Sequence, residues 1–336
     1  MGDRSVDVIR RCMLAVAVAV LIAAPHGPSR AEAPSAEELN AAIVKVKAFV
    51  RSDARTAATL GTEREGTGTL IGGDGLVVTI GYLILEADRV ELIAGGKKVP
   101  AEIVGYDHDT GFGLLRALTK IPAKPLKLGD ASQIKIKDKV LAINYNGAEG
   151  ARPALVVSRR EFAGYWEYML ASAIFTAPPL MDWSGAALVD QEGRLIGVGS
   201  LIVNDPMEGG DIGPGNMFVP IDLLKPVMAD LMTQGKPATT PKPWIGINSE
   251  EVRGRLFITR VSPGTPAEKA GLKKGDIILG VGGKQVNTLG ELYRALWGSG
   301  QAGADVKFNV LQGVAPAEVT VKSIDRYQWL KMNRSY

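Results

Sequence analysis

Short apolar runs separated by glycine-rich turns dominate the stretch between residues 66 and 200. The runs at 69–71 and 76–79 flank Gly-Gly-Asp-Gly, and those at 90–93 and 99–104 flank a Gly-Gly pair. Such turns between β-prone runs predict hairpins. Further runs of this kind lie at 140–143, 154–157, 187–189 and 195–198. Because no helical pattern separates them, they predict a sandwich or barrels rather than a parallel sheet.

Helical periodicity is clearest in three segments. Residues 35–51 begin with Ser35 and Glu38 at the spacing of a capping box and continue with apolar residues at helical intervals. This pattern predicts a surface helix over 35–51. Residues 221–231 and 289–297 predict two further helices.

A basic start precedes a short apolar run at the N-terminus. Arg10 and Arg11 stand before the run 13–24, which is followed by two prolines and then Ser-Arg-Ala. This order predicts a secretory signal cleaved after Ala31, and therefore a periplasmic or secreted protein. The run is shorter than the ~20 residues of a membrane span. An uncleaved anchor, cleavage after Ala33, and export by the general or the twin-arginine route remain open alternatives.

Composition narrows the possible chemistry. The chain carries 39 Lys and Arg against 36 Asp and Glu, which gives no electrostatic reason to expect a nucleic-acid partner. Its 46% hydrophobic and 22% charged residues are typical of a globular protein. Two histidines, His26 and His108, and one cysteine, Cys12, are too few for a His/Cys metal site or a disulfide framework. We therefore expect no metal and no cofactor.

Five segments, taken in order, carry a family resemblance. They read GTGTLI at 66–71, DGLVVT at 74–79, LKLGDAS at 126–132, VLAI at 140–143 and GNMFVP at 215–220. Together with the C-terminal part, they resemble a trypsin-like serine protease of the HtrA (Deg) type followed by a PDZ domain. The resemblance extends over roughly residues 66–326.

This resemblance implies a mostly β fold, with a trypsin-like double β-barrel of the chymotrypsin (PA) type and a small α+β PDZ domain. We expect a signal peptide over 1–31, an N-terminal helical segment over 32–60, the protease-like domain over 61–235, a proline-rich linker over 236–243 and the PDZ domain over 244–326. HtrA-type proteins commonly form trimers, so the resemblance alone implies a homo-oligomer.

The resemblance also locates the positions of a Ser-His-Asp triad. Ser184 stands at the nucleophile position, but Tyr82 stands at that of the histidine and Gly111 at that of the aspartate. A neutral phenol with a pKa near 10 does not readily take the serine proton. Asp182 replaces a glycine whose N–H helps to form the oxyanion hole, and so brings a Cβ and a negative charge there. We expect His108 to be a solvated turn residue rather than a substitute base.

The C-terminal part keeps the PDZ pattern. Residues 262–272 read SPGTPAEKAGL and continue as KKGDIIL, close to the string of HtrA-type PDZ domains. The loop Trp244, Ile245, Gly246 and Ile247 resembles the one whose N–H groups hold the terminal carboxylate of a peptide added as an extra strand. We expect one of its two isoleucines to face the groove. The helix over 289–297 would form the other wall, where the leucines face either the groove or the core: Leu289, Leu292 and Leu296.

Three functions remain in competition. The first is an exported protein with a catalytically degenerate protease domain that binds protein C-termini or unfolded segments as an adaptor or scaffold. The second is an active serine endopeptidase of periplasmic protein quality control, with Ser184 as nucleophile and an unrecognised base. The third is a structural subunit that assembles with active HtrA-type relatives.

Overall fold

The computed structural model describes residues 33–210 and 213–332. The predicted signal sequence, with Cys12 and His26, lies outside the described residues. Within those residues, no helix has the length and apolar character that a membrane crossing requires.

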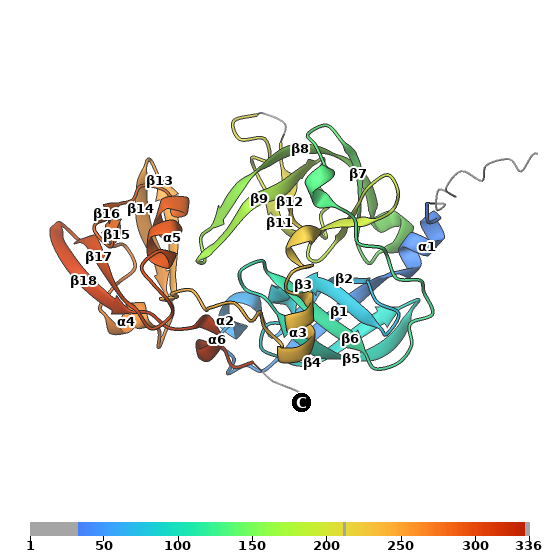
Figure 1. Ribbon diagram of the computed structural model, residues 1–336, viewed down its shortest axis with the longest axis horizontal. Helices are drawn as coiled ribbons and strands as arrows, with labels where there is room; N and C mark the ends of the chain where they lie inside the picture. The colour runs from blue at the N-terminus through green and yellow to red at the C-terminus, as the bar shows by residue number, and fades with distance from the viewer. Residues whose placement is uncertain (1–32, 211–212, 333–336) are drawn as a thin grey trace, which may run out of the picture. The chain divides into compact units, whose positions relative to one another are not determined.

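Six antiparallel strands close the first barrel, in the order β1-β2-β3-β6-β5-β4. Their labels can be followed in Figure 1. The strands are β1 (Ile43–Val50), β2 (Glu63–Leu70), β3 (Leu76–Ile80), β4 (Ala87–Ala94), β5 (Lys97–Tyr106) and β6 (Phe112–Ala117). The glycine-rich turns predicted at 72–75 and 95–96 do join β2 to β3 and β4 to β5.

A second closed barrel follows, in the order β10-β11-β12-β9-β8-β7. Its strands are β7 (Lys139–Ile143), β8 (Ala151–Gly164), β9 (Tyr168–Ala177), β10 (Ala187–Val189), β11 (Leu195–Val203) and β12 (Gly215–Pro220). β8 and β9 form a long hairpin, and its tip comprises residues 165–167. One continuous apolar core fills both barrels, so the predicted double barrel is confirmed.

Short helical segments connect the strands. They are α2 (Ala57–Leu60), α3 (Met228–Gln234) and the 3₁₀ turns η1 (Gly81–Leu83), η2 (Ala131–Gln133), η3 (Gly147–Gly150) and η4 (Ile221–Leu223). The helix predicted over 221–231 is therefore divided into η4 and α3.

The helix predicted over 35–51 is largely wrong. Only α1 (Ala36–Ala41) is helical, capped by Ser35 and Glu38 as expected. The residues that follow form β1, which buries alternate side chains such as Val44 and Val46. Apolar residues four and three apart fit a helix, but the β-branched alternation in the same stretch fits a strand and closes the barrel. The segment over 32–60 is thus not a separate helical piece.

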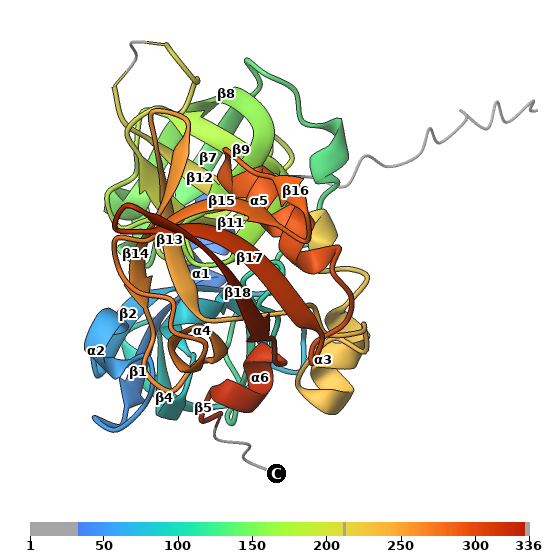
Figure 2. The same ribbon diagram turned by 90° about the vertical axis from the view of Figure 1, so that its left-hand side faces the viewer.

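The C-terminal domain is one antiparallel sheet with short helices. The sheet has the order β13-β14-β15-β17-β18, with β16 beside β15, so β13 is an edge strand. The elements are β13 (Ile247–Val252), β14 (Arg255–Val261), α4 (Pro266–Lys269), β15 (Ile277–Val281), β16 (Lys284–Gln285), α5 (Leu289–Trp297), β17 (Asp305–Gln312) and β18 (Ala315–Lys322). Figure 2 shows this sheet together with α5, which buries Leu292, Tyr293 and Leu296 against it.

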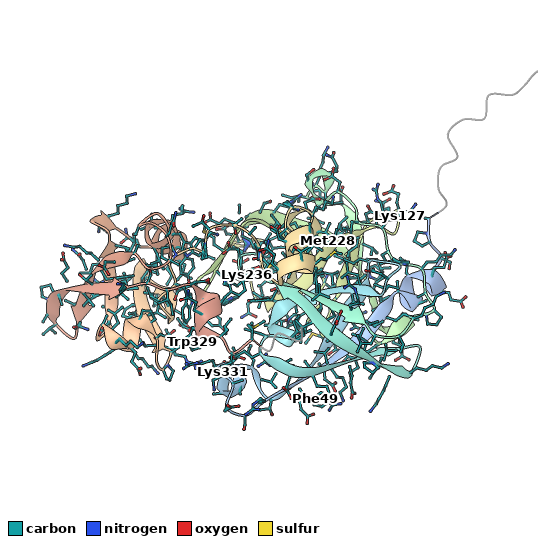
Figure 3. The ribbon with its side chains drawn as sticks, turned by 60° about the horizontal axis from the view of Figure 1, so that its bottom comes forward. Phe49, Lys127, Met228, Lys236, Trp329 and Lys331 are labelled. Atoms are coloured by element: carbon teal, nitrogen blue, oxygen red, sulfur yellow. The ribbon has the colours of Figure 1, made fainter. Side chains whose placement is uncertain are left out.

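The last described segment, which includes α6 (Arg326–Trp329), returns to the first barrel. The buried carboxylate of Glu86 accepts hydrogen bonds from the backbone N–H groups of Arg55, Thr56 and Lys331, at 3.2, 2.7 and 2.7 Å. It also accepts one from the Thr56 hydroxyl at 2.7 Å. Figure 3 labels Trp329 and Lys331 on this segment. Glu86 thereby joins the end of the chain to the turn before α2.

Glu86→Gln should lower the free energy of unfolding by about 1–3 kcal/mol, because an amide NH₂ would face buried N–H donors and leave them unsatisfied. Urea denaturation followed by tryptophan fluorescence measures this change. Glu318→Gln, which removes only an exposed ion pair with Lys307, should stay within about 0.5 kcal/mol of the wild type. Equal losses in the two variants would contradict the role assigned to Glu86.

Candidate functional site

Ser184 lies in a tight turn where the two barrels meet. The Ala186 N–H donates to the Trp183 carbonyl at 3.0 Å, and the Ser184 carbonyl accepts from the N–H of Thr67, on β2, at 2.8 Å. Gly185 has a φ of +75°, and a Cβ there would collide with the Thr67 carbonyl oxygen. The turn therefore requires glycine at 185, and it holds Ser184 against the first barrel.

The structure brings Tyr82 to the serine, as the aligned triad positions predict. Tyr82 lies on η1, and its hydroxyl oxygen is 2.8 Å from Ser184 Oγ and 2.9 Å from the carbonyl oxygen of Ser200. A carbonyl can only accept, so the single phenol proton satisfies Ser200, and the phenol oxygen is left to accept from Ser184.

Tyr82 is a poor base in this setting. Burial raises the pKa of Tyr82 to about 12, while hydrogen bonds with Ser184 and Trp183 act in the opposite direction. The side chain is therefore a neutral phenol at physiological pH. It can orient the Ser184 hydroxyl but does not remove its proton.

Gly111 supplies no carboxylate at the third triad position. Its φ is +85°, and its carbonyl accepts from the Gly81 N–H at 2.6 Å. The position that a Cβ would take lies 3.3 Å from the hydroxyl oxygen of Tyr168, which itself donates to the Thr110 carbonyl at 2.6 Å. A tyrosine from β9 thus borders the place where the family's aspartate would stand.

Asp182 is not among the residues that line the cavity beside Ser184. Its side chain is exposed, and its carboxylate accepts a hydrogen bond from Asn146 Nδ2 at 2.9 Å. Asp182 is not among the residues with positive φ. A Cβ therefore meets no backbone strain at this position, contrary to our expectation from the sequence.

His108 belongs to a different cavity from Ser184. Its ring lies 3.9 Å, centroid to centroid, from that of Tyr327, and it lines a cavity together with Lys236, Lys242 and Arg326. Burial, followed by the charges of these three cations, lowers the pKa of His108 well below its usual value. The expectation of a solvated side chain is wrong: His108 is a half-buried, neutral residue in a structural contact.

A cavity of about 500 Å³ adjoins Ser184. It extends from Ser184 and Tyr82 to Gly246 and Ile247 of the predicted carboxylate-binding loop. Its walls are rich in aromatic and cationic side chains, among them Trp166, Tyr168, Trp183, Trp244, Arg260 and Arg326. The cavity can receive a polypeptide segment with apolar side chains and a negative group.

Three backbone N–H groups of the predicted loop converge on one carboxylate. Those of Gly246 and Ile247 donate to Glu167 Oε1 at 2.7 and 2.9 Å, and that of Ile245 donates to Glu167 Oε2 at 3.1 Å. Gly246 has a φ of +87°, and a Cβ there would collide with Thr265. This geometry binds the side-chain carboxylate of Glu167, whereas the sequence pattern predicts a peptide's terminal carboxylate at this loop.

Glu167 itself was not found by sequence reasoning. It lies at the tip of the β8–β9 hairpin with a φ of +55°, and it is 4% exposed. Burial raises the pKa of its carboxyl to about 7, while the three amide hydrogen bonds and the charge of Arg326 act in the opposite direction. Nothing in the order of residues around Glu167 indicates a contact with a loop almost eighty positions later.

The other residues expected to line the groove lie mainly in the core. Leu292 and Leu296 are fully buried in the core of the C-terminal domain, and Leu289 is half-buried against it. Ile245 and Ile247 are both buried in that core. Trp244 packs near Trp329, with ring centroids 5.0 Å apart.

One side chain of α5 that meets the hairpin is Tyr293, which the sequence analysis missed. Its hydroxyl donates to the Gly164 carbonyl at 2.5 Å and accepts from the Glu167 N–H at 3.1 Å. Its helical spacing from Leu289 and Leu296 is the one signal in the sequence that could have indicated it.

No group of three or more His, Cys, Asp or Glu side chains within residues 33–210 and 213–332 is arranged to hold a metal ion.

Comparison with known proteins matches two domain families. Residues 66–198 match the trypsin-like peptidase domain, and residues 243–323 match the PDZ domain. A probable periplasmic serine endoprotease, DegP-like, of Chlamydia muridarum is 29% identical over 69% of this chain and 48% of its own length. The periplasmic pH-dependent serine endoprotease DegQ of Escherichia coli is 25% identical over 76% of this chain and 58% of its own length. The chain spans about half the length of the curated relatives it matches.

Solved structures of the HtrA-type protease AlgW share the fold. One, with a tripeptide, has a TM-score of 0.52 and 19% identity, and covers 87% of this chain and 98% of its own. Another, with a decapeptide, has a TM-score of 0.50 at the same identity and coverage.

Gly111→Ala should cost about 1–2 kcal/mol of unfolding free energy, because an L side chain at this positive φ is strained. Gly73→Ala is the matched control, since Gly73 has an ordinary φ and open space around its Cβ position. Its effect should be within about 0.5 kcal/mol. Urea denaturation of both variants measures the difference, and a neutral Gly111→Ala would contradict the geometry assigned to this turn.

Proposed function

This chain is of the HtrA type, a trypsin-like peptidase domain followed by a PDZ domain, and we propose that it binds polypeptide C-termini without cleaving them. The observation that carries this proposal is the convergence of three backbone N–H groups, at residues 245–247, on a single carboxylate. A terminal carboxylate is the group that such a loop recognises, and the adjacent edge strand β13 can pair with the peptide behind it.

The absence of proteolysis is the second part of the proposal. Tyr82 is neutral beside Ser184, and Gly111 has no side chain. Loss of both the base and its orienting carboxylate lowers the rate of a triad enzyme on the order of 10⁴- to 10⁶-fold. The protein would then act as an adaptor or scaffold that retains a bound chain near the aromatic cavity instead of hydrolysing it.

We propose the cellular location and the partners of this chain from its relatives. Several of them are named as periplasmic endoproteases, which supports export of this chain to the periplasm. Active HtrA-type proteases are candidate partners, and a homo-oligomer such as a trimer is compatible with the fold. If this assembly rather than peptide binding is the main role, a catalytically complete relative should co-purify with the chain.

An active endopeptidase is the alternative function, and a fluorophosphonate probe tests it. We expect no labelling of Ser184 in the wild type, because no base within the described site activates its hydroxyl. Ser184→Ala is the matched variant, and an active trypsin-like protease serves as positive control. Labelling that disappears in Ser184→Ala, together with digestion of unfolded casein, would overturn the proposal.

Peptide binding is tested with a pool of fluorescent decapeptides that end in a free carboxylate, and with the same pool amidated. The carboxylate pool should bind, and the amidated pool should bind at least about tenfold more weakly. Gly246→Val should abolish binding, since its Cβ enters the loop against Thr265.

Gly254→Val is the control for this substitution. Gly254 also has positive φ, +69°, but it has open space around it and lies in the turn between β13 and β14. Gly254→Val should still bind the peptide. This result would show that Gly246→Val acts through the carboxylate-binding loop and not through backbone strain alone. Equal binding of the carboxylate and amidated pools by the wild type would refute recognition of a C-terminus.

A further inference from the structure

The β8–β9 hairpin makes the contacts that an added peptide strand would make on β13. The Ser249 N–H donates to the Tyr165 carbonyl at 2.9 Å, and the Ile247 N–H donates to the Glu167 carboxylate at 2.9 Å. The two donors are two residues apart on β13, and the two acceptors come from residues two apart on the hairpin. The first contact is a backbone bond of the kind that joins neighbouring strands, and the second places a carboxylate at the start of β13, where a peptide added to the strand would end.

The second wall of the groove also holds the hairpin. Tyr293 on α5 bonds to Gly164 and Glu167, and Arg294 on α5 forms an ion pair with Glu161 at 2.7 Å. Side chains from both hairpin strands, Ala163 and Met169, pack against the core of the PDZ domain. The hairpin is thus held between the edge strand and the helix, where a strand-adding ligand binds.

We propose that Glu167 is an internal substitute for a peptide's terminal carboxylate, and that the hairpin tip occupies the PDZ groove until a partner chain displaces it. This inference rests on the proposed peptide-binding function and specifies its ligand and its regulation. The displaced hairpin would leave the three N–H groups of the loop unpaired, so only a ligand that brings its own carboxylate restores them. Free C-termini therefore replace the hairpin, whereas chain segments that present no carboxylate do not.

Competition between the hairpin tip and a peptide C-terminus sets the apparent affinity of the PDZ groove for the peptide. A ligand's affinity is reduced by the fraction of molecules whose groove is open, and an internal carboxylate held by three N–H groups makes that fraction small. Displacement also releases Glu167 from its left-handed backbone conformation, which returns part of the lost interaction energy to the open form. The groove is thus occupied by default but remains exchangeable.

Glu167→Gln tests this proposal in the full chain with the carboxylate-ending decapeptide pool. An amide at 167 weakens the internal contact, because it brings N–H donors toward the loop's own N–H groups. The variant should bind the pool at least about tenfold more tightly than the wild type. Equal binding by Glu167→Gln and the wild type would overturn the proposal.

Glu208→Gln is the matched control. Glu208 has the same side chain and a similar left-handed φ of +58°, and it forms an ion pair with Arg160 in the second barrel. Its binding should equal that of the wild type. A tenfold gain in both variants would also overturn the role of Glu167.

Hydrogen exchange separates the two proposals. Without peptide, the amide protons of residues 245–249 should exchange slowly in the wild type and faster in Glu167→Gln, and bound peptide should slow their exchange again in the variant. Unchanged exchange would refute the internal occupant. A second outcome is faster exchange in Glu167→Gln while neither the wild type nor any variant binds peptide. That outcome would support Glu167 as the internal occupant and refute the peptide-binding function.

A cross-link tests the opposite change, because it fixes the hairpin in the groove whereas Glu167→Gln loosens it. Glu161→Cys and Arg294→Cys, in a chain that also carries Cys12→Ala, can be joined by a short thiol cross-linker that fixes the hairpin on α5. The joined form should lose peptide binding and the unjoined form should keep it. The control pair is Asn309→Cys and Glu318→Cys, which lie opposite each other on β17 and β18. Its cross-linking should leave binding unchanged, and undiminished binding in the joined 161–294 form would overturn the proposal.

Discussion

The hydrogen bond between the Tyr82 hydroxyl and the Ser200 carbonyl governs the chemistry of this site. A carbonyl offers no proton, so the bond exists only while the phenol keeps its own. Ionising Tyr82 would place a negative oxygen 2.9 Å from a carbonyl oxygen in a buried setting. Tyr82 is therefore held as a neutral phenol, a protonation state that does not take a proton from a neighbouring hydroxyl. Ser184 remains oriented, but its hydroxyl stays neutral.

Much of the fold follows from local sequence, because glycine-rich turns and β-branched runs act over short distances. The hairpins at 72–75 and 95–96 and the helix α5 were predicted on this basis. β1 was misread, since Leu39, Ile43 and Val46 satisfy the helical period, whereas the competing alternation is stabilised only by barrel closure. Tertiary pairing decided the structure there.

In the candidate site, too, some residues could be predicted from the sequence and others could not. Ser184, Tyr82 and Gly246 could be singled out from the sequence, because each stands in a short motif that the family resemblance identifies. Glu167 could not, since its importance comes from three N–H groups that lie far along the chain. The same holds for Glu86, which joins the last described segment to the first barrel. Contacts between distant segments carry the least signal in a single sequence.

The tyrosine beside Gly111 limits which substitutions the site can accept. Tyr168 contributes its hydroxyl to the Thr110 carbonyl and occupies the neighbourhood that a catalytic aspartate would need. Exchanging Tyr82 for histidine would leave the new imidazole without a carboxylate, and introducing a carboxylate at 111 would bring it against Tyr168. A histidine–carboxylate pair beside Ser184 would therefore need coupled substitutions at residues 82, 111 and 168, because no single one of them completes the pair.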